Sequence, residues 1–293
     1  MMQQLAASAK INIGLAVGPV HAGGYHFIDT VFHSIALADR LKWQDAAAFS
    51  LTCSDPALAC DASNLVVRAV KMVEEIVHQP VKRAGHLIKQ IPAGAGLGGG
   101  SADAAAVLRW AILTWPQYAG ALRDQAVYLG KDVPFLIEGG ARRAQGSEEK
   151  LQPLASLDGW HVLLLNPGLA LATPAVYQAF DALDVKHPAR QWYGHSVMDE
   201  ISLALNRHEV PAFLPNALEP AAFMVQPALQ DFKEWVQSII APLPCHLSGS
   251  GATYYALSPD KDEIAFFLRA CQDNKVPWSR MERMEQDKID EIR

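Results

Sequence analysis

The feature that most constrains this chain is a glycine-rich loop that runs directly into an alanine-rich segment. Five glycines fall within the seven positions 94–100, and residues 102–113 follow without a helix-breaking residue. Such a run is entropically costly, so it usually marks backbone with positive φ or backbone that approaches a ligand closely. A loop that opens a helix presents free N–H groups and the positive end of the helix dipole. The sequence therefore predicts a phosphate-binding loop, with Ser101 as the helix N-cap.

The loop differs from the two common nucleotide-binding signatures. It lacks the Gly-Lys-Ser/Thr ending of the Walker loop, and no acidic residue follows at the end of a second strand, as the dinucleotide fingerprint requires. Structural turns and tight helix packing also produce glycine runs. The loop by itself indicates phosphate binding without identifying the class of protein.

Composition excludes several classes of protein. The 293 residues suffice for two domains, and half of them are hydrophobic. A formal net charge of −6 argues against a nucleic-acid partner, and no apolar stretch reaches the length of about 18 residues that predicts a membrane span. We expect a cytoplasmic protein without a bound transition metal, because the cysteines form no zinc-binding pattern and are typical of free thiols: Cys53, Cys60, Cys245 and Cys271.

Periodicity predicts alternating strands and helices along the chain. Strands are expected over 9–17, 30–41, 86–91 and 160–165, and helices over 65–77, 102–113, 175–183 and 227–240. Pro134 is expected to stop any helix, and the charged tail from Met281 to form a solvated helix or a frayed end. The domain boundary is placed between Gly146 and Gly159, which predicts domains over 1–152 and 153–293.

Three separated segments resemble motifs of the GHMP kinase superfamily, whose members phosphorylate small alcohols with ATP. Residues 92–102 resemble its central phosphate motif, residues 8–12 its N-terminal motif and residues 247–252 its C-terminal motif. The resemblance implies a two-domain α/β (α+β) architecture. It consists of a ribosomal-protein-S5-like N-terminal domain and a smaller C-terminal domain of antiparallel sheet plus helices, with the active site between them. Sequence pattern alone supports only mixed α and β structure.

Finer features resemble one branch of the superfamily, which belongs to the non-mevalonate route to isoprenoid precursors. Its alcohol substrate carries a cytidine diphosphate group and is phosphorylated on a 2-hydroxyl. The matching segments are 9–12, 24–26, 64–66, 129–135, 166–168, 173–177 and 216–219. The chain departs from this branch at Gly23, Ala102, Lys131 and Ala217. Lys131 stands where a small residue is common; we expect it to face solvent, where its charge could alter the balance at the site.

The resemblance implies a catalytic pair, with Asp132 as base and Lys10 as its partner. Phosphoryl transfer depends on positioning and charge stabilisation. A nearby lysine keeps an aspartate ionised and can neutralise γ-phosphate charge. Without the resemblance, Asp132 would be interpreted as a turn residue or helix cap, and Lys10 as a surface cation. Mg²⁺ is expected to bridge the nucleotide phosphates, with Ser101 as the only protein side chain suggested for contact. Asp103 is expected to point away from the phosphates.

The resemblance also assigns binding residues in two groups. Those for ATP are Asn64, Pro92, Gly94, Gly96, Leu97, Gly98, Gly99, Gly100 and Ser101. Those for the alcohol are Asn12, Tyr25, His26, Thr173, Tyr177, Ser248 and Gly249. The cytosine would stack between Tyr25 and Tyr177, with His26 at its polar edge and Asn12 on the methylerythritol hydroxyls. A core tyrosine and a hydrogen-bonded turn histidine are the structural alternatives.

Other functions remain as alternatives at this point. The chain could be another GHMP-type kinase for a sugar, homoserine or a mevalonate derivative, a non-catalytic ligand-binding descendant, or a nucleic-acid-binding module. Tyr25, His26 and Tyr177 favour a pyrimidine pocket, whereas Lys10 and Asp132 favour catalysis. The acidic charge balance opposes nucleic acid. The expected partner is therefore a small molecule with a cytidine diphosphate group, bound by a monomer or homodimer.

Overall fold

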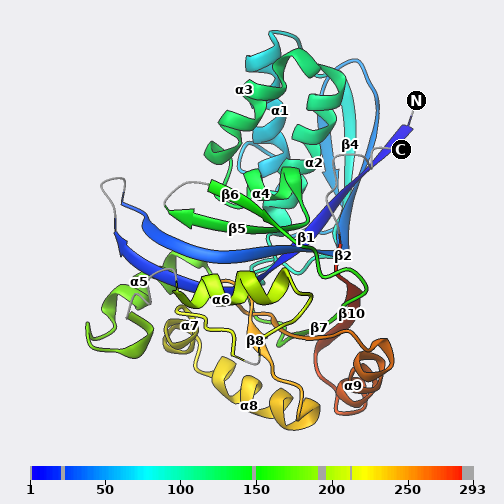
Figure 1. Ribbon diagram of the computed structural model, residues 1–293. Helices are drawn as coiled ribbons and strands as arrows, with labels where there is room; N and C mark the ends of the chain where they lie inside the picture. The colour runs from blue at the N-terminus through cyan, green and yellow to red at the C-terminus, as the bar shows by residue number, and fades with distance from the viewer. Residues whose placement is uncertain (1, 21–23, 147–149, 191–195, 212, 286–293) are drawn as a thin grey trace.

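Two β-sheets organise the computed structural model, which describes residues 2–20, 24–146, 150–190, 196–211 and 213–285 (Figure 1). The larger sheet contains β1 (Met2–Val20), β2 (His26–Asp45), β3 (Ser50–Cys53), β4 (Arg83–Ile88), β5 (Ala141–Gly146) and β6 (Lys150–Leu154). Its order is β3-β4-β2-β5-β6, with β1 paired to β2. The sheet is mixed because β3 and β4 pair in parallel.

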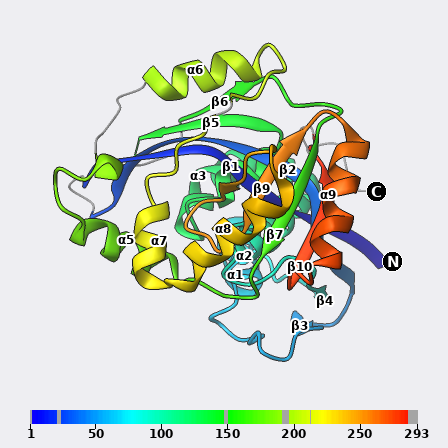
Figure 2. The same cartoon turned by 90° about the horizontal axis from the view of Figure 1, so that it is seen from below.

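The smaller sheet is antiparallel, in the order β10-β7-β9-β8. Its strands are β7 (His161–Asn166), β8 (His246–Leu247), β9 (Tyr254–Ser258) and β10 (Trp278–Arg283). The same half of the chain contains α5 (Thr173–Ala182), α6 (Ser196–Leu205), α7 (Glu219–Val225), α8 (Ala228–Ile240) and α9 (Lys261–Asp273). Helices α8 and α9 pack on the smaller sheet. Helix α6 instead contacts β1 and β2, and in the view from below it lies beside β5 and β6 (Figure 2). The two sheets with their helices confirm the predicted fold class, including the antiparallel second sheet.

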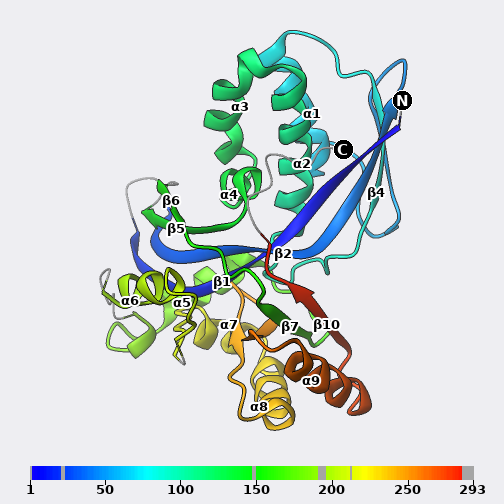
Figure 3. The ribbon, with the colours of Figure 1, turned by 45° about the vertical axis from the view of Figure 1, so that its right-hand side comes forward.

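The hairpin of β1 and β2 extends through both halves of the molecule (Figures 1 and 3). The register shifts between Ser8 and Lys10, and the neighbours of β1 change at this point. Leu5 and Ala7 belong to the core beneath the helices of the larger sheet, whereas Ile11 belongs to the core against the smaller sheet. Because side chains alternate along a strand, Lys10 projects from the face opposite to Ile11.

Four helices pack on one side of the larger sheet: α1 (Leu65–Val77), α2 (Gly99–Thr114), α3 (Ala119–Gln125) and α4 (Val133–Glu138). Helix α2 lies at their centre and is buried from Ala102 to Ile112. Its alanines allow α1, α4 and β1 to approach it closely. The predicted helix over 65–77 is confirmed without a change of bounds.

Three local predictions are wrong. Gly98, not Ser101, is the N-cap of α2; its left-handed φ of 73° turns the backbone into the helix without a side-chain cap. Pro134 does not stop a helix but lies in the first turn of α4, where its missing N–H group is not needed. The tail from Met281 is a strand in part, because Met281 pairs with Leu163 in the smaller sheet. Residues 286–293, like the departure at Gly23, lie outside the described residues.

The domain boundary between 152 and 153 stays a prediction. Strand β6 spans this point and pairs with β5 of the larger sheet. The segment that follows it, 155–160, leads into β7 of the smaller sheet. Among the described helices, none is long and apolar enough to cross a membrane.

Candidate active site

The glycine-rich loop is held almost entirely by backbone contacts. The N–H of Leu171 donates to the carbonyl of Gly94 (3.0 Å), that of Thr253 to Ala95 (3.1 Å) and that of Lys10 to Leu97 (3.1 Å). These bonds bring the central, N-terminal and C-terminal motifs of the sequence together, although they are far apart along the chain. The loop is therefore fixed before any ligand binds.

The closest approach in the loop is at Gly96. Its φ is +74°, and a Cβ there would collide with the carbonyl oxygen of Ser248 and lie 2.9 Å from that of Gly251. The hydroxyl of Ser248 also donates to the carbonyl of Gly96 (3.0 Å). Only glycine fits this position, because the two loops touch backbone to backbone.

The loop lines a cavity of about 510 Å³, which we call the first cavity. Most of the predicted site residues line it together: Lys10, Asn12, Asn64, Pro92, Gly94, Gly96, Gly98, Gly99, Gly100, Ser101, Asp132, Thr173, Tyr177 and Gly249. Two predicted residues lie behind its wall instead. The side chain of Leu97 is buried in the core, and Ser248 is fully buried and joins the two loops.

Lys10 and Asp132 face each other in the first cavity. The Nζ atom of Lys10 lies 3.4 Å from Oδ2 of Asp132 and donates to Oδ1 of Asn12 (2.7 Å). Asp132 occupies the N-cap position of α4, yet its carboxylate makes no capping bond within the described helix. The carboxylate points towards the lysine instead of its own helix. This geometry favours a chemical role for Asp132 over the helix-cap interpretation.

Asn12 holds Lys10 through a network that the sequence did not reveal. Its Nδ2 donates to the hydroxyl of Thr30 (3.0 Å), which donates to the carbonyl of Gly14 (2.6 Å). The hydroxyl of Tyr255 donates to the carbonyl of Asn12 (2.7 Å). Both ends of the Asn12 amide are therefore oriented, and its oxygen is directed at the lysine ammonium.

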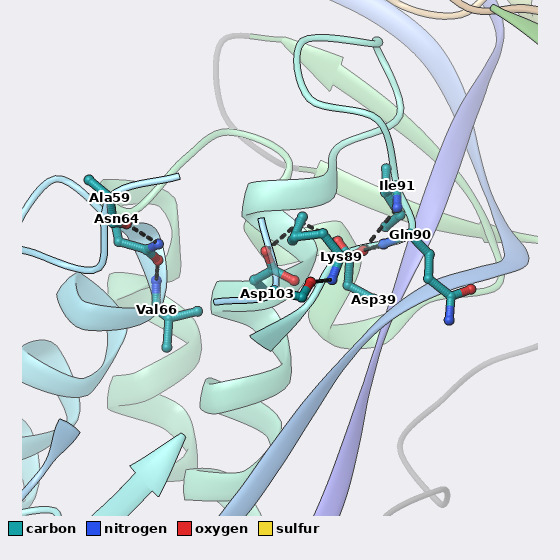
Figure 4. Close-up of polar contacts among 9 residues, drawn as sticks. Asp39, Ala59, Asn64, Val66, Lys89, Gln90, Ile91 and Asp103 are labelled. Atoms are coloured by element: carbon teal, nitrogen blue, oxygen red, sulfur yellow. Dashed lines mark hydrogen bonds and ion pairs between the residues drawn. The ribbon is translucent and has the colours of Figure 1, made fainter. Parts of the chain in front are cut away.

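A buried ion cluster lies beneath the loop, and Figure 4 shows it. Lys89 pairs with Asp39 and with Asp103 (2.8 Å), while Asp39 accepts the N–H of Ile91 (2.9 Å) just before the loop. Burial raises the pKa of Asp103 to about 7; the charge of Asp39 adds to this, whereas Lys89 opposes it. Asp103 is thus directed at Lys89. The sequence analysis missed Lys89 and Asp39, whose only signal is a charge at the end of an apolar strand.

Asn64 lines the first cavity but is engaged by its own surroundings. Its Oδ1 accepts the N–H of Val66 (2.9 Å) as the N-cap of α1, and its Nδ2 donates to the carbonyl of Ala59 (2.8 Å) (Figure 4). Its side chain therefore fixes the start of α1 at the edge of the cavity.

A second cavity of about 560 Å³ adjoins the first. His26 stacks on Tyr177, with 5.5 Å between ring centroids, and its Nδ1 lies 2.7 Å from the carbonyl oxygen of Gly18. Tyr25 is exposed, with the Nζ atom of Lys131 4.9 Å from its ring centroid. Tyr25 and Tyr177 both line this cavity, and His26 contacts Tyr177 directly. The stacking of a cytosine between the two tyrosines stays a prediction.

The two cavities share a wall. Five residues line both: Ile28, Phe32, Asp132, Thr173 and Tyr177. Burial, and the charge of Asp132, raise the pKa of the Tyr177 hydroxyl, so this hydroxyl stays protonated beside the carboxylate. A carboxylate between two cavities, with an ammonium next to it, can serve a reaction between a ligand in one cavity and a ligand in the other.

The described residues contain no group of three or more His, Cys, Asp or Glu side chains that could hold a metal ion. Mg²⁺ does not need such a group, because phosphates and water supply most of its ligands. Ser101 and Asp132 are oxygen donors that line the first cavity. The donor set therefore fits a magnesium ion that enters with a polyphosphate.

Comparisons with known proteins match nearly the whole chain. Residues 64–140 match the model of the GHMP kinases N terminal domain, and residues 196–276 match that of the GHMP kinases C terminal domain. The 4-diphosphocytidyl-2-C-methyl-D-erythritol kinase of Acaryochloris marina is 35% identical over 284 residues, 92% of this chain and 91% of the relative. That of Salinispora tropica is 37% identical over 276 residues, 89% and 86% of the two chains.

Solved structures agree with this assignment of the fold. A crystal structure of 4-(cytidine 5'-diphospho)-2C-methyl-D-erythritol kinase superimposes with a TM-score of 0.72 at 32% identity, over 96% of this chain and 98% of the other. Homoserine kinase from Cytophaga hutchinsonii has a TM-score of 0.67 at 16% identity, over 98% and 95%. The second likeness shows the shared fold alone.

Proposed function

The chain belongs to the GHMP kinases, and from this premise we propose that it transfers the γ-phosphoryl group of ATP to the 2-hydroxyl of 4-diphosphocytidyl-2-C-methyl-D-erythritol. This reaction is a step of the non-mevalonate route to isoprenoid precursors. The observation that carries the proposal is the position of Asp132, which lines both cavities 3.4 Å from Lys10. The relatives of 35–37% identity are kinases of this alcohol.

The first cavity is proposed to hold ATP. GHMP kinases use ATP, and the loop over 92–101 lines the cavity together with the N-terminus of α2, a position that favours phosphates. ATP is proposed to enter as its magnesium complex, with the metal on the phosphate oxygens. The loop supplies few charges of its own, so the phosphates are held by backbone dipoles and neutralised by the metal and Lys10.

The second cavity is proposed to hold the alcohol. Tyr25 and Tyr177 offer aromatic faces for the cytosine, and stacking on such faces is worth about 1–3 kcal/mol per base. Thr173, which lines both cavities, is proposed to contact the methylerythritol end. This orientation directs the 2-hydroxyl to the shared wall and leaves the cytosine at the outer end of the cavity.

Asp132 is proposed to accept the proton of the 2-hydroxyl as its oxygen attacks the γ-phosphorus. One oxygen–phosphorus bond forms, the bond between the γ-phosphorus and the β-bridging oxygen breaks, and ADP leaves. Lys10, which is paired with Asp132, offsets the negative charge of the transferred group. Asn12 orients Lys10 by accepting its hydrogen bond.

The test is ADP release with ATP, magnesium and 4-diphosphocytidyl-2-C-methyl-D-erythritol, with the phosphorylated product identified by mass. Asp132→Asn is expected to lower kcat by about 10²–10⁴-fold. Asp181→Asn is the matched control, because Asp181 lines the second cavity alone. Release with homoserine or mevalonate but not with the cytidine alcohol would contradict the substrate. Equal rates for Asp132→Asn and Asp181→Asn would contradict the role of Asp132.

A further inference from the structure

The charges around the second cavity are unevenly balanced. Among the described residues that line it, Asp132 and Asp181 are acidic, and Lys131 is the single side chain with a permanent positive charge. His26 is already engaged through both ring nitrogens, one near the carbonyl of Gly18 (2.7 Å) and one near Asp181 (3.2 Å). An anionic ligand in this cavity would meet two carboxylates, of which Asp132 is paired with Lys10 of the first cavity, and the ammonium of Lys131.

Lys131 is placed where it can act on such a ligand. It directly precedes Asp132, and its ammonium lies 4.9 Å from the ring centroid of Tyr25 at the outer part of the same cavity. A cation–π contact at an exposed position is worth about 0.5–1 kcal/mol, so a charge-assisted hydrogen bond to a phosphate would be the stronger interaction. The backbone of Asp132 anchors α4, which fixes the base of the lysine side chain.

The second cavity differs from the first in the groups it offers to a phosphate. The first is lined by a glycine-rich loop and the N-terminus of α2. The described lining of the second includes the first turn of α5, at Thr173 and Pro174, but Pro174 has no N–H group to donate. Side-chain charge is therefore needed to hold a diphosphate here, and Lys131 supplies it.

We infer that Lys131 binds the diphosphate group of the alcohol substrate and so selects an alcohol that carries this group. The inference rests on the proposed function and adds a residue to it. The ammonium would lie between the cytosine on Tyr25 and the hydroxyl beside Asp132, which is where the diphosphate joins the two ends of the substrate. Lys131 is a binding residue in this account, and the proton transfer remains with Asp132.

The first experiment compares steady-state rates of Lys131→Met, Lys131→Arg and the wild type. Lys131→Met is expected to raise the KM for 4-diphosphocytidyl-2-C-methyl-D-erythritol about tenfold, with the change carried by KM and not by kcat. Lys131→Arg should restore most of the affinity, because it keeps the charge. The ratio of the KM values of Lys131→Met and wild type should shrink at high salt, since the contact is exposed.

Lys186→Met is the matched control for a general change of charge. Lys186 is exposed and follows α5, which supplies Tyr177 and Asp181, but it does not line the second cavity. A rise in KM for Lys186→Met equal to that for Lys131→Met would assign the effect to long-range electrostatics and overturn the inference.

The second experiment measures the contribution of the diphosphate to binding separately from that of the cytosine. Cytidine diphosphate and cytidine are used as competitive inhibitors against the alcohol. Lys131→Met should weaken inhibition by cytidine diphosphate about tenfold and leave inhibition by cytidine unchanged. Equal weakening of both inhibitors, or of neither, overturns the inference. A wild type that does not phosphorylate the cytidine alcohol at all would refute the proposed function first, so the two failures are distinguishable.

Discussion

The two cavities differ in the groups that shape them, although they share a wall. The first is shaped by backbone: a glycine-rich loop that touches the 248–251 turn and opens α2. The second is shaped by side chains, among them Tyr25, His26 and Tyr177. In the first cavity, a substitution such as one at Gly96 displaces the backbone itself, so few residues can be changed. In the second cavity, single side chains can be replaced without moving the backbone. The proposed function accordingly assigns substrate choice to the second cavity and the binding of the ATP phosphates to the first.

The largest expected effect concerns the ion cluster beneath the glycine-rich loop of the first cavity. Lys89→Met would leave Asp39 and Asp103 buried without their cation, and the free energy of unfolding should fall by about 3–5 kcal/mol. Urea unfolding at pH 8 measures this. Asp103→Asn is the control: it keeps the pair of Lys89 with Asp39 and removes a carboxyl whose pKa is raised to about 7, so its loss should be small. Equal losses for the two variants would show that the buried carboxylates left without a cation are not the cause of the loss in Lys89→Met.

The next prediction concerns Gly96 and separates two reasons for a glycine: contact with the 248–251 turn and a positive φ. Gly96→Ala should reduce kcat more than about a hundredfold, because the added Cβ displaces the loop from the 248–251 turn. Gly159→Ala is matched in conformation: its φ is +78° against +74°, nothing lies within 4 Å of its Cβ, and it lines neither cavity. It should cost only the strain of a positive φ, about 1–2 kcal/mol in stability. If both variants lose activity alike, the contact with Ser248 is not what shapes the first cavity.

A smaller effect on KM is expected for the ligand of the second cavity alone. Tyr25→Leu is expected to raise the KM for the cytidine alcohol about tenfold, because one stacking face is lost. The KM for ATP should stay the same, since Tyr25 does not line the first cavity. Tyr25→Phe keeps the ring and should behave as the wild type. A matching rise in the KM for ATP would mean that the two cavities are not separable.

The smallest expected effect is a pH dependence of stability due to His33, which lies next to the wall shared by the two cavities. Phe32 lines both cavities, and the next residue, His33, accepts the N–H of Leu157 (3.0 Å). Burial lowers the pKa of His33 from 6.5 to about 4, against opposing contributions from Ser34 and Asp158. The neutral ring therefore adds stability above pH 6.5, and this stability is lost as the pH falls from 6.5 towards 4.

Between pH 6.5 and pH 5.5 this loss should be about 1 kcal/mol. Thermal or urea unfolding of wild type and His33→Gln at both pH values measures it. The variant should lack this part of the pH dependence, because glutamine does not titrate. Identical pH dependence in the two proteins would assign the wild-type slope to other groups.

The sequence predicted the elements that carry a local pattern. Helix α1 was found with its bounds because Val66, Val70 and Val73 repeat at helical spacing and bury one face. Strand β10 was not found. Its charges on both sides of Met281 suggested a solvated tail, and only pairing with β7 gives Met281 a place beside Leu163. Such pairing depends on a strand more than a hundred residues away and leaves no local signal.

The site residues fall into the same two groups, those with a local sequence pattern and those that depend on distant packing. Its three glycine-bearing or charged motifs were recognisable, and the structure brings Lys10, Asp132 and the loop to one cavity. The stack of His26 on Tyr177 and the bond from Asn12 to Thr30 depend on distant packing. So does the cluster around Lys89, because a charge at the end of a strand shows no partner until the sheet forms.

The long hairpin of β1 and β2 also bears on how the chain acquires its active form during synthesis. Lys10 leaves the ribosome long before the residues that its strand contacts last: Leu15 bonds to Pro215 and Ala217, and Asn12 accepts the hydroxyl of Tyr255. The lysine is therefore enclosed only after most of the chain has emerged. A truncated product of translation that ends before residue 248 would lack the bonds from Ser248 to the glycine-rich loop and from Tyr255 to Asn12, and we expect it to lack kinase activity.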